Sequence, residues 1–154
     1  WNVVSEIREK FKNECFKCKR DLSKAKRSDF HIDHVLPAKY LWRLEDATAL
    51  LCGRCNLEKR DKWPSHFYSV DQLKELSLYT GMSFELLSSK EPKINPDALE
   101  KAKQNADEIY RELADRPREM KKLRNIILKV EGIDIIDYIK SYNKEDILKL
   151  LSVY

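Results

Sequence analysis

The chain has 154 residues, of which 36% are charged and 42% are hydrophobic, and its formal net charge at pH 7 is +4. This composition is typical of a folded globular domain and excludes a disordered tail or a membrane-embedded bundle. No apolar run is long enough to span a bilayer, and no secretory signal segment stands near the N-terminus. The length suits either one hydrophobic core, or a small domain that carries a functional site together with a second, helical region.

The positive charge is concentrated in the first part of the chain. Residues 1–65 contain 15 Lys and Arg against 10 Asp and Glu, whereas residues 66–154 contain 15 against 16. A basic half favours a polyanionic partner; the sign of the charge alone fits nucleic acid, an anionic membrane or a merely solvated face. The chain begins at Trp1 rather than Met, so we expect a fragment of a longer protein.

Four short elements are predicted in the first 62 residues. Apolar side chains at helical spacing predict an amphipathic helix over residues 3–13. Alternating apolar and polar side chains predict a strand over residues 30–36, which ends there because proline follows. A second short strand is predicted over residues 48–51 and a helix over residues 55–62, with Asn56 near its start where a side-chain cap is favoured.

From residue 69 onward the pattern is helical throughout. Helices are predicted over residues 71–80, 98–113, 120–130, 134–142 and 144–154. Their apolar stripes indicate a core rather than a ligand site. We therefore expect two regions, a site domain over residues 1–65 and a helical accessory region over residues 66–154, with a further boundary in the proline-containing link near residues 91–96.

The four cysteines form two Cys-x-x-Cys turns, Cys15 with Cys18 and Cys52 with Cys55, separated by 33 residues. Two such turns can supply four thiolates at about 2.3 Å from one zinc ion without strain. Disulfides or free thiols are the alternatives, but nothing in the sequence indicates secretion. We predict a structural zinc ion with no open coordination position, in a reducing, cytoplasmic compartment.

Three further side chains can serve phosphodiester hydrolysis, which needs a general base and a divalent cation held by the protein. His34 suits the base because the unperturbed pKa of histidine lies near working pH. Oxygen donors from Asp33 and Asn56 suit Mg²⁺ or Mn²⁺ rather than zinc. The plainer alternatives are that Asp33 caps a turn, that Asn56 caps a helix and that His34 is structural.

Two stretches together, DHVLP at residues 33–37 and CGRCNLEK at residues 52–59, resemble the HNH endonuclease family of the type with a four-cysteine zinc site. The resemblance covers residues 1–65. It implies an α+β fold, in which a ββα-metal nuclease module with a pair of zinc knuckles precedes the mostly α-helical C-terminal region.

The resemblance implies that His34 is the general base and that Asp33 and Asn56 hold the catalytic Mg²⁺ or Mn²⁺. It also implies a helix lying along nucleic acid. Its basic side chains are then expected to contact phosphates, the alternative being solvated helix charge: Arg54, Lys59 and Arg60. His31 is a candidate third residue of the site.

One departure from the family concerns its middle Asn, which orients the catalytic His and falls here on Ala47 or Thr48. The side chain of Ala47 cannot orient an imidazole, whereas the hydroxyl of Thr48 can. The usual Gly-Gly of the preceding loop is replaced by residues 40–42, Tyr-Leu-Trp. We expect this chain to fix His34 in a different way, the alternative being a weakened nuclease.

These observations predict a metal-dependent DNA endonuclease acting on double-stranded DNA, in restriction, phage defence or a mobile element. Two alternatives remain open: a non-catalytic zinc-containing module that binds DNA or protein, and an RNase or nuclease toxin on the same fold. Residues 66–154 are a candidate homodimer surface, and no membrane partner is expected.

Overall fold

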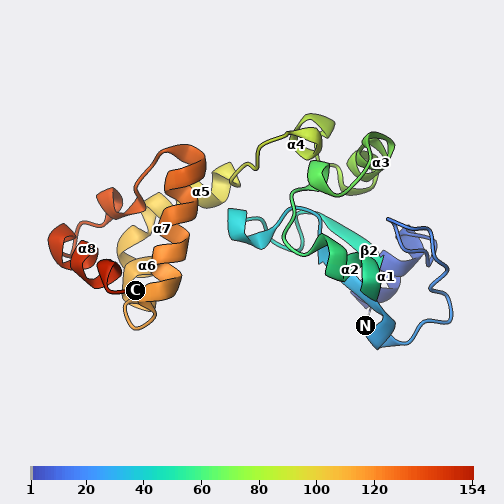
Figure 1. Ribbon diagram of the computed structural model, residues 1–154, viewed down its shortest axis with the longest axis horizontal. Coiled ribbons are helices and arrows are strands. Elements are labelled where there is room, and N and C mark those ends of the chain that lie inside the picture. Colours follow the sequence, from blue (N-terminus) through green and yellow to red (C-terminus); the bar gives the residue numbers. More distant parts are fainter. Residues whose placement is uncertain (1) are drawn as a thin grey trace. The chain divides into compact units, whose positions relative to one another are not determined.

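The computed structural model describes residues 2–154, which form two compact units (Figure 1). Unit 1 comprises the chain up to Ala38 together with Trp42–Pro92, and unit 2 comprises Lys39–Leu41 and Lys93–Tyr154. The division between them falls after Pro92, inside the proline-containing link. Within residues 2–154, none of the helices combines the length and the apolar character that crossing a membrane requires.

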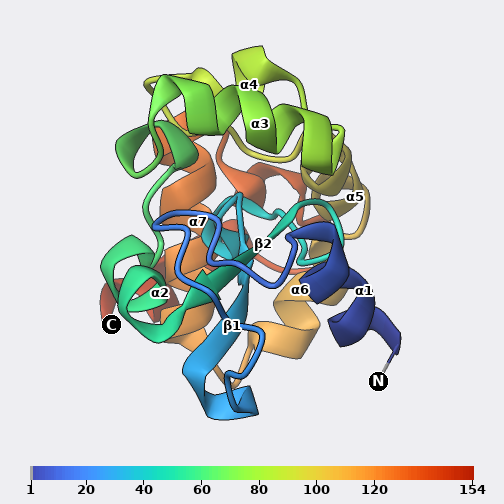
Figure 2. The same ribbon diagram turned by 90° about the vertical axis from the view of Figure 1, so that its right-hand side faces the viewer.

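The elements up to Ser88 are short helices around one two-stranded sheet. In chain order they are α1 (Asn2–Lys10), η1 (Arg27–Asp29), β1 (Phe30–His34), η2 (Ala38–Tyr40), β2 (Thr48–Cys52), α2 (Gly53–Lys59), η3 (Pro64–His66), α3 (Val70–Thr80) and α4 (Phe84–Ser88), where η denotes a 3-10 helix. Figure 2 shows α2 beside the two strands.

The two strands pair antiparallel, with His34 opposite Thr48. The amide of Val35 donates to the carbonyl of Ala47 at 3.0 Å, so that pair is a hydrogen-bonded one. Because hydrogen-bonded and non-hydrogen-bonded pairs alternate, His34 and Thr48 form a non-hydrogen-bonded pair, whose side chains lie close together on one face. The strand ends at His34, two residues before its expected end.

Residues 66–92 belong to unit 1 rather than to the helical remainder of the chain, and α3 with the segment before it packs on the first cysteine turn. Gln72 of α3 donates from Nε2 to the carbonyl of Lys17 at 2.8 Å. In return, Lys17 Nζ donates to the carbonyl of Phe67 at 2.5 Å. Leu73 and Leu76 present the buried side of α3. The compact part of unit 1 therefore extends well beyond residue 65.

Unit 2 is built from helices alone. They are α5 (Pro96–Gln104), α6 (Ala106–Leu113), α7 (Pro117–Glu131), η4 (Ile135–Tyr138) and α8 (Lys144–Ser152). Its core is made of apolar side chains that recur at helical spacing, among them Leu99, Met120, Ile127, Ile135, Ile147 and Leu151.

Two predicted helices of this region differ from the observed ones. The helix predicted over residues 98–113 is broken at Asn105, whose Nδ2 donates to the carbonyl of Lys101 at 2.9 Å. An asparagine side chain competes with the backbone for such bonds and thereby favours a break. The helix predicted over residues 134–142 is a single 3-10 turn, Ile135–Tyr138.

A bidentate ion pair joins α7 to the turn that follows it. Arg124 Nε donates to Asp134 Oδ1 at 2.9 Å, and Arg124 Nη2 donates to Asp134 Oδ2 at 2.6 Å. The hydrogen bonds from Arg124 lower the pKa of Asp134 below its usual value, against a smaller opposing effect of burial. Because the folded-state pKa is lowered, this stabilisation is present above the unfolded-state pKa and is lost as pH falls through the folded-state pKa.

Replacement of Asp134 by Asn should lower the free energy of unfolding of unit 2 by about 2 kcal/mol at pH 7, a typical value for charge-assisted hydrogen bonds. The difference from the wild type should vanish as the pH falls through the lowered pKa of Asp134. Hydrogen exchange of the α7 amides measures both the loss of stability and its dependence on pH. Asp137→Asn, which removes an exposed pair with Lys144, is the matched control and should change stability by less than about 1 kcal/mol; equal effects of the two variants would contradict the prediction.

Candidate metal centre and active site

The first cysteine turn, Cys15–Cys18, is held by backbone hydrogen bonds. The amide of Cys15 donates to the carbonyl of Arg20 at 2.9 Å, and the amide of Lys19 donates to the carbonyl of Cys15 at 2.8 Å. Lys19 has a φ of +58°, in the left-handed region that a tight reversal requires. The amide of Phe16 donates to the carbonyl of Leu50 at 2.8 Å, which ties this turn to the outer edge of β2.

The second cysteine turn, Cys52–Cys55, joins β2 to α2. Cys52 is the last residue of the strand and the N-cap of the helix, and Cys55 lies in the first helical turn. Side chains three residues apart at a helix start lie on one face, so both thiols point to the same side. The sheet thereby delivers both cysteines to the edge where the first turn is bound.

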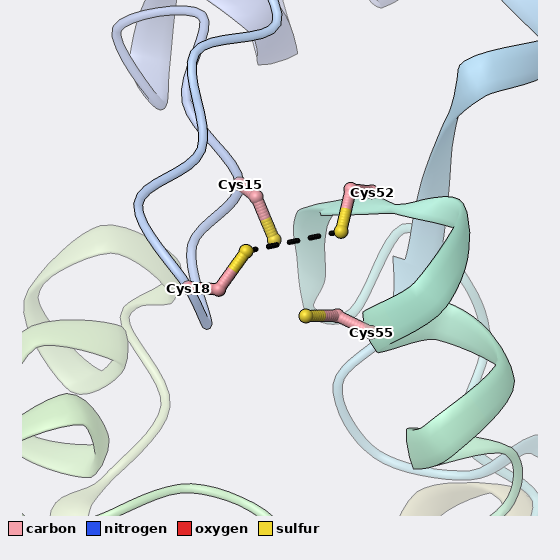
Figure 3. Close-up of side chains that lie close together, drawn as sticks. All are labelled: Cys15, Cys18, Cys52 and Cys55. Atoms are coloured by element: carbon pink, nitrogen blue, oxygen red, sulfur yellow. Dashed lines mark hydrogen bonds between the residues drawn. The ribbon is translucent and has the colours of Figure 1, made fainter.

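The four thiols converge on one point (Figure 3). All four Sγ atoms lie within 4.8 Å of one another, and those of Cys18 and Cys52 are 3.8 Å apart. A tetrahedral zinc ion with Zn–S distances of about 2.3 Å places its sulfurs about 3.8 Å apart. No disulfide links these residues. The prediction that the four cysteines form one group able to hold a structural zinc ion is confirmed.

The thiols influence one another strongly. Burial raises the pKa of Cys52, but the amide of Cys55 and the neighbouring thiols outweigh it and bring that pKa to about 7. Burial and those same thiols raise the pKa of Cys55. One sulfur thus becomes a thiolate easily at the expense of the others. Four thiolates can share this space only with a cation among them, and soft sulfur donors favour zinc over Mg²⁺.

Helix α2 lies along β1 and runs in the same direction. The ring of His31 reaches the start of the helix, since its Nε2 lies 3.9 Å from the position that a Cβ on Gly53 would take. The end of the helix reaches the end of the strand, where Lys59 contacts Asp33. Asn56 lies between these two contacts, one turn before Lys59 and on the same helix face. Asn56 is therefore beside the strand rather than at the N-cap, which is Cys52.

Lys59 does not lie where a phosphate-contacting residue should. Its side chain is only 1% exposed. Among the described residues, Lys59 is the only charged residue that is buried. The ammonium lies 2.8 Å from Oδ2 of Asp33 and donates to the carbonyl of His34 at 2.5 Å. The expectation that Lys59 touches nucleic acid is therefore wrong, because the helix face that carries it is covered by β1. Arg54 and Arg60 are exposed on α2 and its C-cap.

The carboxyl group of Asp33 is enclosed by this arrangement, with 12% of its side chain exposed. Burial raises its pKa above the usual value, and the Lys59 ammonium, followed by the imidazoles of His34 and His31, opposes that rise. Oδ2 meets Lys59 at ion-pair distance although not in hydrogen-bond geometry, and it has no other polar partner among the described residues. The ion pair holds the carboxylate in place and leaves Oδ1 for other contacts.

The structure brings the predicted site residues together only in part. Asp33 and His31 lie on the strand face that meets α2, whereas His34 points to the opposite face, because successive strand residues alternate. His34 ends the strand and shares its face with Thr48. Ala47 fixes the chain beside His34 through its backbone, because its carbonyl accepts a hydrogen bond from the amide of Val35, the residue after His34.

Tyr68 is a residue that the sequence did not reveal. Its ring is buried, its hydroxyl has no hydrogen-bond partner in the described residues, and burial raises its pKa well above the usual value. The charges of Asp33, Cys15 and Cys55 add to that rise, so the phenol lies close to both the ion pair and the sulfur cluster. Nothing in the local pattern distinguishes it from an ordinary core aromatic.

No family model matches this chain, and no curated protein or solved structure matches it either.

Removal of the metal should unfold unit 1 and leave unit 2 folded, because unit 1 loses the cross-link between its two cysteine turns and keeps four crowded thiols without a cation. Purified protein should contain one zinc ion per chain by elemental analysis. A strong chelator, or the variant Cys52→Ser, should abolish the fluorescence signature of Trp42 and Trp63, both in unit 1, while helical circular dichroism from unit 2 persists. Re-addition of zinc, but not of Mg²⁺, should restore the signal; unchanged fluorescence in metal-free protein would rule out a structural ion.

Replacement of Lys59 by Met should destabilise unit 1 by about 3 kcal/mol, because it leaves the Asp33 carboxylate buried without its cation. The double variant Asp33→Asn with Lys59→Met should recover most of that loss. Urea unfolding followed by tryptophan fluorescence measures both. Lys62→Met, an exposed lysine on the same segment, is the control; an equally small effect for Lys59 and Lys62 would show that the ion pair is not structural.

Proposed function

We propose that this chain is a metal-dependent endonuclease of HNH type that hydrolyses the phosphodiester bonds of double-stranded DNA. The observation that carries the proposal is the arrangement strand, strand, helix, with Asp33 and His34 at the end of β1 and Asn56 on the helix packed against it. The four-cysteine group anchors the start of that helix, as the resemblance implies.

His34 acts as the general base in this proposal. It removes a proton from a water molecule, the water oxygen bonds to phosphorus, and one P–O ester bond breaks. His34 is the last residue of β1, and because its ring lies on the face opposite to Asp33, this role requires a phosphate that meets both side chains at the end of the strand. Thr48, directly opposite on the other strand, supports the ring from the side, and the backbone of Ala47 fixes the chain immediately after it.

The proposed cation is Mg²⁺ or Mn²⁺, held by Asp33 and Asn56. Its donors are a carboxylate oxygen and a carboxamide oxygen from two elements in contact, a set that suits a hard cation. When bound, the cation would stabilise the negative charge that develops on the phosphate. The Lys59 ion pair engages Oδ2 of Asp33, so Oδ1 is the atom proposed for the cation.

A second candidate function is a zinc-containing module that binds nucleic acid without cutting it. The observation that favours it is also the Asp33–Lys59 pair, because a carboxylate neutralised by a buried ammonium attracts a further cation less strongly. The family's missing middle Asn points in the same direction. The two functions differ in one measurable property, which is cleavage.

A plasmid-nicking assay distinguishes them. Wild-type protein with its zinc retained should nick supercoiled DNA when Mg²⁺ or Mn²⁺ is added, and should be inactive in a buffer dialysed free of both; a chelator is avoided because it would strip the zinc. His34→Ala should lower the rate by at least about 100-fold, the usual contribution of a general base, without changing tryptophan fluorescence.

His66→Ala is the matched control, since His66 is exposed and bonds to the carbonyl of Lys90. It should cut at the wild-type rate. Cleavage by His34→Ala at the wild-type rate would remove His34 from the mechanism. Binding of DNA without nicking under any metal would favour the non-catalytic module, and digestion of structured RNA alone would favour an RNase.

A further inference from the structure

A cavity of about 340 Å³ lies on unit 1 between α1 and the segment that leads into β1. It is lined by Val4, Ser5, Arg8, Arg27 and Phe30. Two of its walls are apolar, one carries a hydroxyl, and two are guanidinium groups. A volume of this size is in the range of small-ligand pockets, which begins at about 300 Å³. None of these residues takes part in the site proposed above.

Both arginines are held in place by contacts within unit 1. Arg8 donates from Nη2 to the carbonyl of Leu22 at 2.7 Å and from Nε to Oδ1 of Asn13 at 3.0 Å. Arg27 donates from Nη1 to the carbonyl of Phe30 at 3.1 Å. Each guanidinium also lies on the ring of Phe30, at 4.8 Å for Arg8 and 5.1 Å for Arg27. The two cations are thus positioned before any ligand arrives.

Their charges are close, and no carboxylate of the described residues neutralises them. Since both lie on one ring, the two guanidinium groups are within about 10 Å of each other, about one Debye length at 0.1 M salt. The partners of both in the described residues are carbonyl and amide oxygens and the aromatic ring, with no carboxylate among them. Asp29, two residues after Arg27 in the chain, instead accepts from the amide of Lys26 and the hydroxyl of Ser28.

Two fixed, unneutralised guanidinium groups facing one cavity favour an anion with several acceptor oxygens, and phosphate geometry matches the arginine fork. A free phosphate ion would leave the apolar wall formed by Val4 without a partner. A phosphate that carries a sugar would satisfy both kinds of wall.

The cavity also has a defined relation to the proposed active site. Phe30 begins β1 and His34 ends it, so the two residues are about 13 Å apart along the strand. They lie on the same strand face, because an even number of residues separates their positions. A strand of nucleic acid whose scissile phosphate meets His34 can therefore reach the cavity with a neighbouring nucleotide.

We propose that this cavity is a second nucleic-acid site of unit 1, in which Arg8 and Arg27, supported by the buried ring of Phe30, hold a backbone phosphate of the bound strand and Val4 contacts its sugar. The inference rests on the proposed nuclease function and adds to it a contact away from the reacting phosphate, which would set the position of the DNA without reading its sequence.

Binding of a fluorescent 20-base-pair duplex, measured by anisotropy over a range of salt concentrations, tests the proposal. The His34→Ala background without added Mg²⁺ or Mn²⁺ prevents cleavage. Arg27→Gln should reduce the slope of log affinity against log salt by about one, the expected loss for one phosphate contact. Ser5→Glu, which places a carboxylate in the cavity, should also weaken binding of the duplex, because the carboxylate competes with the phosphate for the two arginines. Arg20→Gln removes an exposed arginine of unit 1 outside the cavity and should change the slope by less than half as much.

Equal slopes for Arg27→Gln and Arg20→Gln would overturn the proposal in favour of a diffuse basic face. NMR signals of the side-chain Nε–H groups of Arg8 and Arg27 should shift with the duplex; shifts with a mononucleotide or inorganic phosphate but not with the duplex would also overturn it. Failure of the nuclease function is distinguishable, because it appears as no nicking in the plasmid assay, whereas failure of this inference leaves nicking intact and the salt slope of Arg27→Gln unchanged.

Discussion

Convergence of two cysteine turns on one point is the constraint on which the rest of unit 1 depends. The first turn has no secondary structure of its own beyond an isolated bridge between Glu14 and Asp21, yet it is bound to the edge of β2 and to α3. The second turn begins α2. A cation held among the four sulfurs would therefore join the N-terminal loop, the sheet and the helix at once. Small folds that bury little apolar surface commonly need such a cross-link.

The buried ion pair between Asp33 and Lys59 has the same effect at the other end of α2. It fixes the helix against β1 and links the backbone of His34 to the helix through the same ammonium. The proposed base and the proposed cation ligand are thus both positioned by a residue that touches no substrate. The same ion pair favours the non-catalytic alternative, because a paired carboxylate is a poorer cation ligand than a free one.

Unit 2 is held together in a different way. Its core is aliphatic, its helices carry asparagine caps at Asn95 and Asn143, and its principal polar contact is the Arg124–Asp134 pair. The chemistry proposed for this chain lies in unit 1, as do the proposed second nucleic-acid site and the cysteine group. Two of the basic residues that give the first 65 residues their positive charge, Arg8 and Arg27, line one cavity of unit 1.

Local sequence patterns predicted most elements and the four-cysteine group, because helix and strand periodicity and the spacing of Cys-x-x-Cys turns act over a few residues. They did not predict the break at Asn105 or the role of Lys59, which looked like an exposed helix charge. Only the tertiary structure decided these points: which face of α2 meets β1 determines that Lys59 is buried and Arg54 is not, and packing of α3 on the first turn determines where unit 1 ends. Such contacts join residues far apart in the chain, so no local pattern carries them.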